Sequence, residues 1–95
     1  MRESTLERRL VREVKRIGGV APKWTSPGNG GVPDRLVILP NGRTVFVEMK
    51  APGKSLTPLQ ERWAQILRGL GHRVYKLDSI ESIDKFIAEV SADEN

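Results

Sequence analysis

A carboxylate and an amine, Glu48 and Lys50, lie two residues apart in a segment that is predicted to be a strand. Residues 35–39 and 43–49 are rich in β-branched and apolar side chains and flank Pro40-Asn41-Gly42, so we expect them to form an antiparallel hairpin. Because side chains alternate across a strand, Glu48 and Lys50 share one face at the end of the second strand. The register of the hairpin decides which side chain lies opposite them.

The length of the connecting loop sets this register. A two-residue turn would place Glu48 opposite Arg35, whereas a three-residue loop would place it opposite Asp34. The longer loop is favoured, with Pro40-Asn41 in a type I turn and Gly42 in the left-handed conformation, because the fixed φ of proline suits the first central position of that turn. We therefore predict that Asp34 and Glu48 face each other.

Two carboxylates opposed at about 5 Å repel each other unless a cation lies between them. Oxygen ligands of this kind suit Mg²⁺ or Mn²⁺ rather than zinc or copper. The ammonium group of Lys50 could then stabilise charge on a phosphorane or lower the pKa of an attacking water. Asp34, Glu48 and Lys50 are therefore candidates for phosphodiester hydrolysis. From the residues alone, a surface ion pair of Glu48 with Lys50 or Arg35 is a slightly better explanation, because such pairs are common.

Length and composition limit the other possibilities. The chain has 95 residues, which corresponds to one small domain, expected over residues 1–90 with a frayed tail at 91–95. It has no cysteine and one histidine, which excludes thiolate nucleophiles, disulfide frameworks, zinc ribbons and His-rich metal sites. No apolar run is long enough for a membrane helix and no signal peptide is recognisable, so we expect a cytoplasmic protein without a membrane partner.

The net charge of +4 is unevenly distributed. Residues 1–50 carry ten basic and five acidic side chains, whereas residues 51–95 carry six and seven. A basic half favours a polyanionic partner such as nucleic acid, although solubility alone can account for a modest excess. Part of this charge lies on the first predicted helix, as a solvated face whose second use could be DNA contact: Arg8, Arg9, Arg12, Lys15 and Arg16.

The chain is predicted to alternate helices and strands. The first helix begins at the capping box Ser4-Thr5-Leu6-Glu7 and ends at Gly18-Gly19. A short strand candidate at 20–24 is interrupted by Pro22. The later elements are a helix whose N-cap is Thr57, a strand at 73–77 and a helix that opens at Ser79.

The resulting order, helix–three strands–helix–strand–helix, predicts an α/β fold with a mixed sheet flanked by helices. The middle helix carries an apolar stripe that we expect to face the core, including Trp63. Its members are Leu59, Trp63, Ile66, Leu67 and Leu70.

Two motifs resemble those of a known nuclease family. The run Gly31-Val32-Pro33-Asp34-Arg35-Leu36 and the later Glu48-Met49-Lys50, with thirteen residues between Asp34 and Glu48, look like the PD-(D/E)xK nuclease signature. The run from Lys50 to Gln60, KAPGKSLTPLQ, resembles the VRR-NUC (virus-type replication-repair nuclease) family, and the similarity reaches from Glu7 to the strand at 73–77. The resemblance implies a restriction-endonuclease-like core of the stand-alone type.

What the resemblance implies for the site can be stated residue by residue. Lys50 would position or activate the attacking water, and Gln60 would reach back to Lys50 or to a phosphate. Independently of the resemblance, we expect DNA contacts through the backbone of a substrate-facing glycine loop and through a point charge on a phosphate, at Gly30, Gly31, Arg35 and Lys54. The metal, Mg²⁺ or Mn²⁺, would be held by the side chains of Asp34, Glu48 and Glu7 and by the backbone carbonyl of Met49.

The resemblance also implies an activity, namely metal-dependent endonuclease cleavage of branched DNA in repair or recombination, by a viral or bacterial protein. For the stand-alone type it implies four-way (Holliday) junction cleavage by a homodimer, and Trp24 and the exposed sheet edge are candidate dimer surfaces. A catalytically silent DNA-binding or scaffolding domain of the same fold is the alternative. A site-specific restriction enzyme is less favoured, because a small chain leaves little surface for base readout.

Several of these residues have simpler explanations. Glu7 could be the capping-box acid of the first helix, and Gln60 could be an ordinary helix-surface residue. Gly53-Lys54-Ser55 resembles part of a Walker loop, but Glu48 stands where that loop requires glycine, so no nucleotide cofactor is expected.

Overall fold

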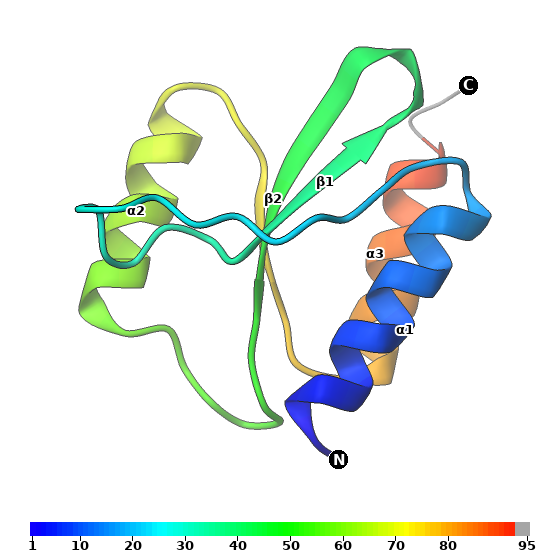
Figure 1. Ribbon diagram of the computed structural model, residues 1–95, viewed down its shortest axis with the longest axis horizontal. Coiled ribbons are helices and arrows are strands. Elements are labelled where there is room, and N and C mark those ends of the chain that lie inside the picture. Colours follow the sequence, from blue (N-terminus) through cyan, green and yellow to red (C-terminus); the bar gives the residue numbers. More distant parts are fainter. Residues whose placement is uncertain (93–95) are drawn as a thin grey trace.

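The computed structural model describes residues 1–92 as a three-layer arrangement of helices around a small sheet (Figure 1). β2 is the central strand, with β1 antiparallel on one side and β3 parallel on the other. α1 and α3 lie side by side on one face and α2 covers the other, which confirms the predicted fold class. The elements are α1 (Glu3–Arg16), β1 (Arg35–Leu39), β2 (Arg43–Met49), α2 (Pro58–Gly69), β3 (Val74–Leu77) and α3 (Ile80–Ala92).

The alternation of side chains along β2 divides the core in two. Val45, Val47 and Met49 face the main core beneath α1 and α3. Phe46, on the other face, packs against the small cluster beneath α2, which consists of Ala64, Leu67 and Val74. The end of β2 beyond Phe46 is therefore left for polar residues on the α2 side, and Glu48 and Lys50 occupy it.

The predicted hairpin register is confirmed, because Leu39 pairs with Arg43 and Arg35 pairs with Val47. The predicted turn is wrong in one detail. Asn41, expected in the right-handed region, has φ 65°, and Gly42 also has a positive φ of 73°. Asparagine tolerates the left-handed conformation better than other residues with a Cβ. The loop therefore keeps its length and register with a different backbone path.

The strand predicted at 20–24 is reduced to two isolated bridges, Val20 to Ile38 and Lys23 to Arg35. The segment still runs antiparallel along β1, and the carbonyl of Pro22 accepts a hydrogen bond from Leu36. Proline has no N–H to donate in return, so the ladder is interrupted at that residue.

The capping box predicted for the first helix is also absent. α1 begins at Glu3, with Arg2 at the N-cap and no side-chain cap. Ser4 therefore lies inside the first turn, and Glu7 is released from a capping role. The side of α1 that packs on the sheet consists of Leu6, Leu10 and Val14.

The apolar stripe of α2 is mostly exposed, contrary to expectation. Leu59, Ile66 and Leu70 are 53%, 38% and 72% exposed, and Trp63 is half-buried. The residues of α2 that are buried against the sheet are Ala64 and Leu67. Periodicity had identified an apolar face correctly, but a three-stranded sheet is too small to cover all of it.

α3 includes Ser91 and Ala92, two residues of the tail that was expected to fray. Val90 is fully buried and its carbonyl accepts a hydrogen bond from Arg43 at 2.9 Å, which fixes the end of the helix. Residues 93–95, the rest of that tail, lie outside the described residues. No helix within residues 1–92 has the length and apolar character needed to cross a membrane.

Candidate active site

The site is built where β1 begins and β2 ends. Asp34 directly precedes β1, and the register places it beside Glu48. Its backbone carbonyl accepts a hydrogen bond from the Trp24 amide at 2.8 Å, and its Oδ1 accepts one from the Met49 amide at 3.1 Å. Asp34 is therefore tied through its backbone to the neighbouring segment and through its side chain to β2.

Lys50 is positioned by the parallel strand on the other side of β2. Its backbone amide donates to the carbonyl of Leu77 at 3.0 Å, one residue beyond the last ladder pair between Met49 and Leu77. The hairpin thus positions Asp34 against Glu48, while β3 holds the backbone of Lys50 at the same end of the sheet.

Glu48 is a buried acid whose negative charge is offset only in part, by Lys50. It is 6% exposed, and within residues 1–92 its side chain makes no hydrogen bond or ion pair. Burial, followed by the negative charge of Asp34, raises the pKa of Glu48 to about 7, and Lys50 lowers it only in part. The pKa of Asp34 is also raised, first by burial and then by the charge of Glu7, against the opposing effect of the Met49 hydrogen bond.

This electrostatic environment suits a divalent cation. Buried carboxylates at raised pKa are stabilised as anions when a cation binds between them. Within residues 1–92, no three His, Cys, Asp or Glu side chains gather into a metal-binding group. An ion here would therefore rest on two carboxylates and complete its shell with backbone carbonyl, water or phosphate oxygens, which is the usual pattern for Mg²⁺.

Glu7 lies near this pair but is engaged by another residue. Its Oε1 accepts a hydrogen bond from the guanidinium of Arg35 at 3.1 Å, and Arg35 also donates to the Ala21 carbonyl at 2.8 Å. The Arg35 side chain is 11% exposed and links α1 to the start of β1, and its predicted contact with DNA stays a prediction. The metal-ligand role predicted for Glu7 is left untested.

Gln60 has a local structural role. Its Oε1 accepts from the Thr57 amide at 2.9 Å, and its own amide donates to Thr57 Oγ1 at 3.2 Å. The sequence predicted Thr57 as the N-cap correctly but did not recognise that Gln60 closes the capping box. Its carbonyl therefore faces the helix start, and contact with Lys50 or a phosphate stays a prediction.

The glycine loop before Asp34 packs on the start of α2. Gly31 has φ 91°, and a Cβ at this position would lie 2.7 Å from the backbone of Leu59. A side chain is excluded there by both conformation and space. Gly30 and Lys54 are exposed, as the predicted DNA contact requires of them.

One acidic residue near the site was missed. The charge of Glu3 contributes to raising the pKa of both Asp34 and Glu48. Glu3 precedes Glu7 by four residues on α1, so the two acids share one side of the helix. The four-residue spacing between Glu3 and Glu7 could have indicated from the sequence that both acids lie near the site. The prediction that Ser4 was the N-cap, however, placed Glu3 outside the helix.

A mixed sheet between helices, with Asp34, Glu48 and Lys50 at one end of its central hairpin, defines a nuclease core of the restriction-endonuclease-like class. Comparison with known proteins supports this assignment to a nuclease class. The model of the VRR-NUC domain matches residues 3–80. "Putative nuclease p44" of Acyrthosiphon pisum secondary endosymbiont phage 1 is 57% identical over 79 residues, which cover 83% of this chain and 85% of the phage protein.

A solved structure described as a VRR_NUC domain superimposes with a TM-score of 0.85 at 32% sequence identity. The similarity covers 90% of this chain and 94% of the solved one. The chain belongs to the VRR-NUC family, and it is a nuclease domain.

Proposed function

We propose that this protein is a divalent-metal-dependent DNA endonuclease that hydrolyses phosphodiester bonds in branched DNA, with four-way junctions as its main substrate. The observation that carries the proposal is the opposed pair of half-buried Asp34 and buried Glu48 beside Lys50, whose pKa values are both raised by burial, since neighbouring groups offset their negative charge only in part. Two opposed carboxylates with raised pKa values reduce the stability of the folded state unless a cation binds between them. The similarity to a phage protein also supports action on DNA in the cytoplasm of a host cell, in repair or recombination.

The proposed roles follow from placement. Asp34 and Glu48 would hold Mg²⁺ or Mn²⁺, with the carbonyl of Met49 as a further oxygen. When bound, the ion supplies Lewis-acid stabilisation of the phosphate and lowers the pKa of water. Lys50 presents an ammonium group on the same face as Glu48, where it orients the attacking water and offsets negative charge that develops on the phosphoryl oxygens. The Met49 amide keeps the Asp34 carboxylate turned toward β2.

Cleavage of a panel of DNAs tests this proposal. The wild-type protein should nick a labelled four-way junction with Mg²⁺ or Mn²⁺ at least about tenfold faster than a linear duplex of the same sequence, and EDTA should stop the reaction. Asp34→Ala should be inactive, and Asp84→Ala, which changes an acid on α3, should stay active. If junctions are bound but no divalent metal supports cutting, the protein is a silent DNA-binding domain instead.

The proposed active form is a homodimer, because two cuts related by a two-fold axis resolve a four-way junction. The exposed apolar stripe of α2, made of Leu59, Trp63, Ile66 and Leu70, supports this proposal. Antiparallel packing of two α2 helices would place Leu59 opposite Leu70 of the second copy and Trp63 opposite Ile66, so the stripe is self-complementary. The surface differs from the earlier candidates, since Trp24 stacks on Phe46 at 5.4 Å.

Replacing Ile66 with glutamate should therefore convert the protein to a monomer. A charge buried at the centre of a small apolar interface costs several kcal/mol, which exceeds what a marginal dimer can lose. Light scattering after gel filtration should give twice the 10.6 kDa chain mass for wild type and the single mass for the variant. Gln65→Glu introduces the same side chain on another side of α2 and should stay dimeric. A monomeric wild type, or a dimeric Ile66→Glu protein, would contradict the assignment.

A further inference from the structure

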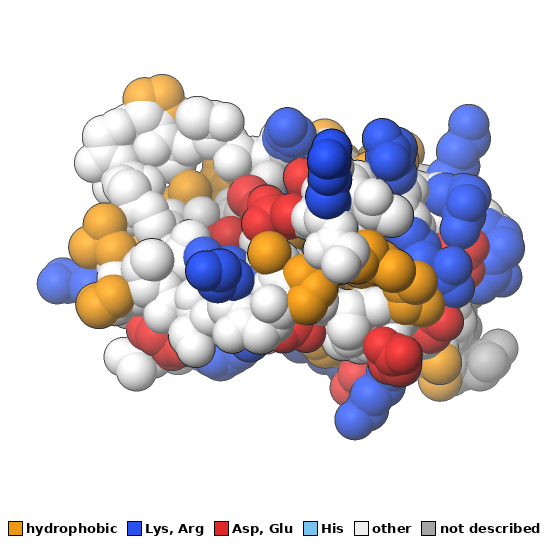
Figure 2. Space-filling view, turned by 90° about the horizontal axis from the view of Figure 1, so that it is seen from below, with side chains coloured by type: hydrophobic (Ala, Val, Ile, Leu, Met, Phe, Trp, Pro, Cys, Tyr) orange, Lys and Arg blue, Asp and Glu red, His pale blue; other side chains and the backbone are white. Residues whose placement is uncertain are grey.

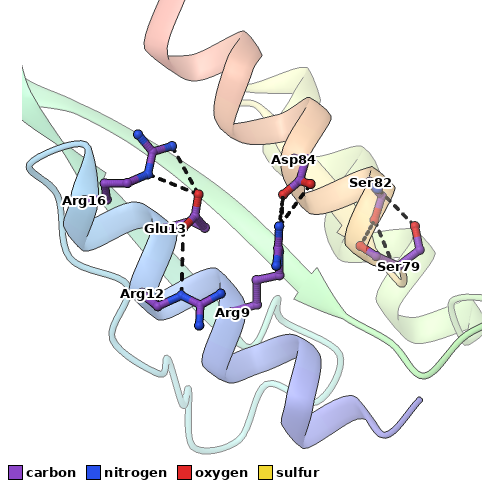
Figure 3. A network of polar contacts seen from close by, with 7 residues as sticks. All are labelled: Arg9, Arg12, Glu13, Arg16, Ser79, Ser82 and Asp84. Atoms are coloured by element: carbon purple, nitrogen blue, oxygen red, sulfur yellow. Dashed lines mark hydrogen bonds and ion pairs between the residues drawn. The ribbon is translucent and has the colours of Figure 1, made fainter.

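The basic residues of α1 fall into two groups with different environments, and Figure 3 shows the contacts that Arg9, Arg12 and Arg16 make with acidic residues. Arg9 reaches across to α3 and binds both carboxylate oxygens of Asp84, at 3.0 and 3.1 Å. Arg16 binds Glu13 at 3.1 Å. Arg9 therefore links α1 to α3, and Arg16 forms an ion pair within α1, so both charges are offset by acidic residues of the protein itself.

The second group is exposed and lies on another side of the helix. Arg8, Arg12 and Lys15 are spaced four and three residues apart, which places them on one face of α1. Arg12 is 68% exposed, and its contact with Glu13 is a long one of 3.9 Å. Within residues 1–92, Arg8 and Lys15 make no ion pair or hydrogen bond through their side chains. Their charges are therefore open to solvent.

These three cations border a groove between α1 and the segment that follows it. We call it the α1 groove, with Arg8, Arg12 and Lys15 as its rim. Its floor is apolar and consists of Val11, Val20, Ala21 and Pro22, and the part of the groove between Lys15 and Pro22 has a volume of about 500 Å³.

The α1 groove adjoins the candidate active site at Glu7, which lines the same hollow as Arg8 and Arg12 and whose charge raises the pKa of Asp34. Arg35 also lines this hollow, with its side chain on the opposite face of β1 from that of Asp34. Figure 2 shows acidic side chains gathered near the middle of the face seen from below, with Lys and Arg concentrated on the side of α1 and α3. Because Glu7 is paired with Arg35, the cations along the groove are not offset by it.

We propose that the α1 groove binds the phosphate backbone of one arm of the DNA substrate, next to the bond that is cut. This inference rests on the proposed function, and it assigns a definite binding surface to three cations of a helix face that the sequence had interpreted first as solvated and only second as a DNA contact. A helix rises 1.5 Å per residue, so the rim from Arg8 to Lys15 extends about 10 Å, close to three 3.4 Å steps of a duplex strand. The apolar floor would contact the sugars, and the rim would contact the phosphates.

The competing occupant, an acidic protein segment, fits less well. A regular row of cations beside an active centre that acts on a polyanion matches the periodic charge of a nucleic-acid strand. Cations at such positions supply affinity that depends on salt and not on base sequence. The measurable consequence is a change in the salt dependence of DNA binding when rim charges are removed.

Binding of fluorescent DNA, measured by anisotropy in EDTA over a range of salt, tests the proposal without cleavage. Arg8→Ala/Lys15→Ala should reduce the slope of log affinity against log salt by about 1.8 for a junction with duplex arms, or by about 1.4 for a single strand. The affinity at moderate salt should fall about tenfold. Lys15→Ala alone should reduce the duplex slope by about 0.9, and its matched control is Lys85→Ala, at an exposed position of α3, which removes one positive charge elsewhere and should leave the slope nearly unchanged.

Three results would overturn the inference: an unchanged slope in the double variant, an equal effect of Lys85→Ala, or capture of an acidic peptide in preference to DNA. Thermal melting of each variant shows whether the fold is intact, and the exposed substitutions should leave it unchanged. Failure of this inference can be distinguished from failure of the nuclease proposal, because the binding measurement requires no cleavage. A protein that binds through the rim and never cuts would retain the groove and lose the proposed activity.

Discussion

Replacing Glu48 with glutamine is expected to remove metal-dependent cleavage and, in the same variant, to stabilise the metal-free protein at pH 8. Loss of one of two carboxylate ligands should reduce the cleavage rate about 10³-fold, since a bound metal contributes several kcal/mol to the transition state. The gain in stability arises because a charge that is costly to bury has been removed. Activity and stability therefore change in opposite directions.

The sign follows from the pKa of Glu48. Burial and Asp34 raise it from the ordinary 4.5 to about 7 in the folded protein, so between these values the folded state binds more protons than the unfolded state. The free energy of unfolding then falls as pH rises through this window, and above pH 7 the full cost of an ionised Glu48 is present. The shift corresponds to roughly 3 kcal/mol at most, from which imperfect hydrogen bonding of the new amide subtracts about 1–2 kcal/mol.

Urea unfolding in EDTA at pH 5 and pH 8 measures this effect. Glu48→Gln should be more stable than wild type at pH 8 by roughly 1–2 kcal/mol, and the advantage should shrink or vanish at pH 5. Glu89→Gln, at an exposed position of α3, makes the same chemical change and should alter neither stability nor cleavage appreciably. A Glu48→Gln protein that is destabilised at pH 8 would show that the Glu48 charge does not destabilise the fold. One that cleaves normally would show that catalysis does not need this carboxylate.

The hairpin that brings Asp34 to Glu48 was predictable because its determinants are local. Loop length and the fixed φ of Pro40 set the register, and the register brings Asp34 to Glu48. An error in the conformation of Asn41 did not matter, since the count of loop residues was unchanged. The parallel pairing of β2 with β3 followed from the intervening helix, which is the usual crossover between parallel strands.

The environment of the hairpin was less predictable, because it depends on contacts between distant residues. The guanidinium of Arg35 bonds Glu7, 28 residues away, and the carbonyl of Ala21, 14 residues away. No local sequence pattern predicts a hydrogen bond between residues so far apart in the chain. The exposed stripe of α2 illustrates a related limit, since periodicity identifies an apolar face of a helix without identifying what covers it.

The same reasoning separates the two groups of cations on α1. The spacing of these cations was visible in the sequence. Which of them forms an ion pair with α3 depends on how α3 packs against α1, and the sequence pattern does not show this. Asp84 takes Arg9 because α1 and α3 lie together over one face of the sheet. Glu13 binds Arg16 along α1 itself. The cations that remain available to a partner are Arg8, Arg12 and Lys15.

Metal binding is expected to depend steeply on pH below 7, which is the second large effect. The metal-free site holds a proton on Glu48 with a pKa of about 7, and an incoming cation must displace it. The apparent affinity for Mn²⁺ should therefore fall about tenfold for each pH unit below 7 and level off above it. The pKa of Asp34 is also raised, so the dependence should become steeper at the acidic end.

Calorimetric titration of Mn²⁺ between pH 5.5 and 8.5, in buffers of different ionisation enthalpy, reports both the affinity and the protons released. Wild type should release close to one proton per ion near pH 6 and almost none at pH 8.5, and Glu89→Gln should behave in the same way. Glu48→Gln should bind Mn²⁺ far more weakly and lose the pH dependence between 6 and 7, because the group that titrates there is gone. An affinity for Mn²⁺ that stays constant from pH 5.5 to 8.5 would mean that the ion binds away from Glu48, and the metal role assigned to the Asp34–Glu48 pair would fail with it.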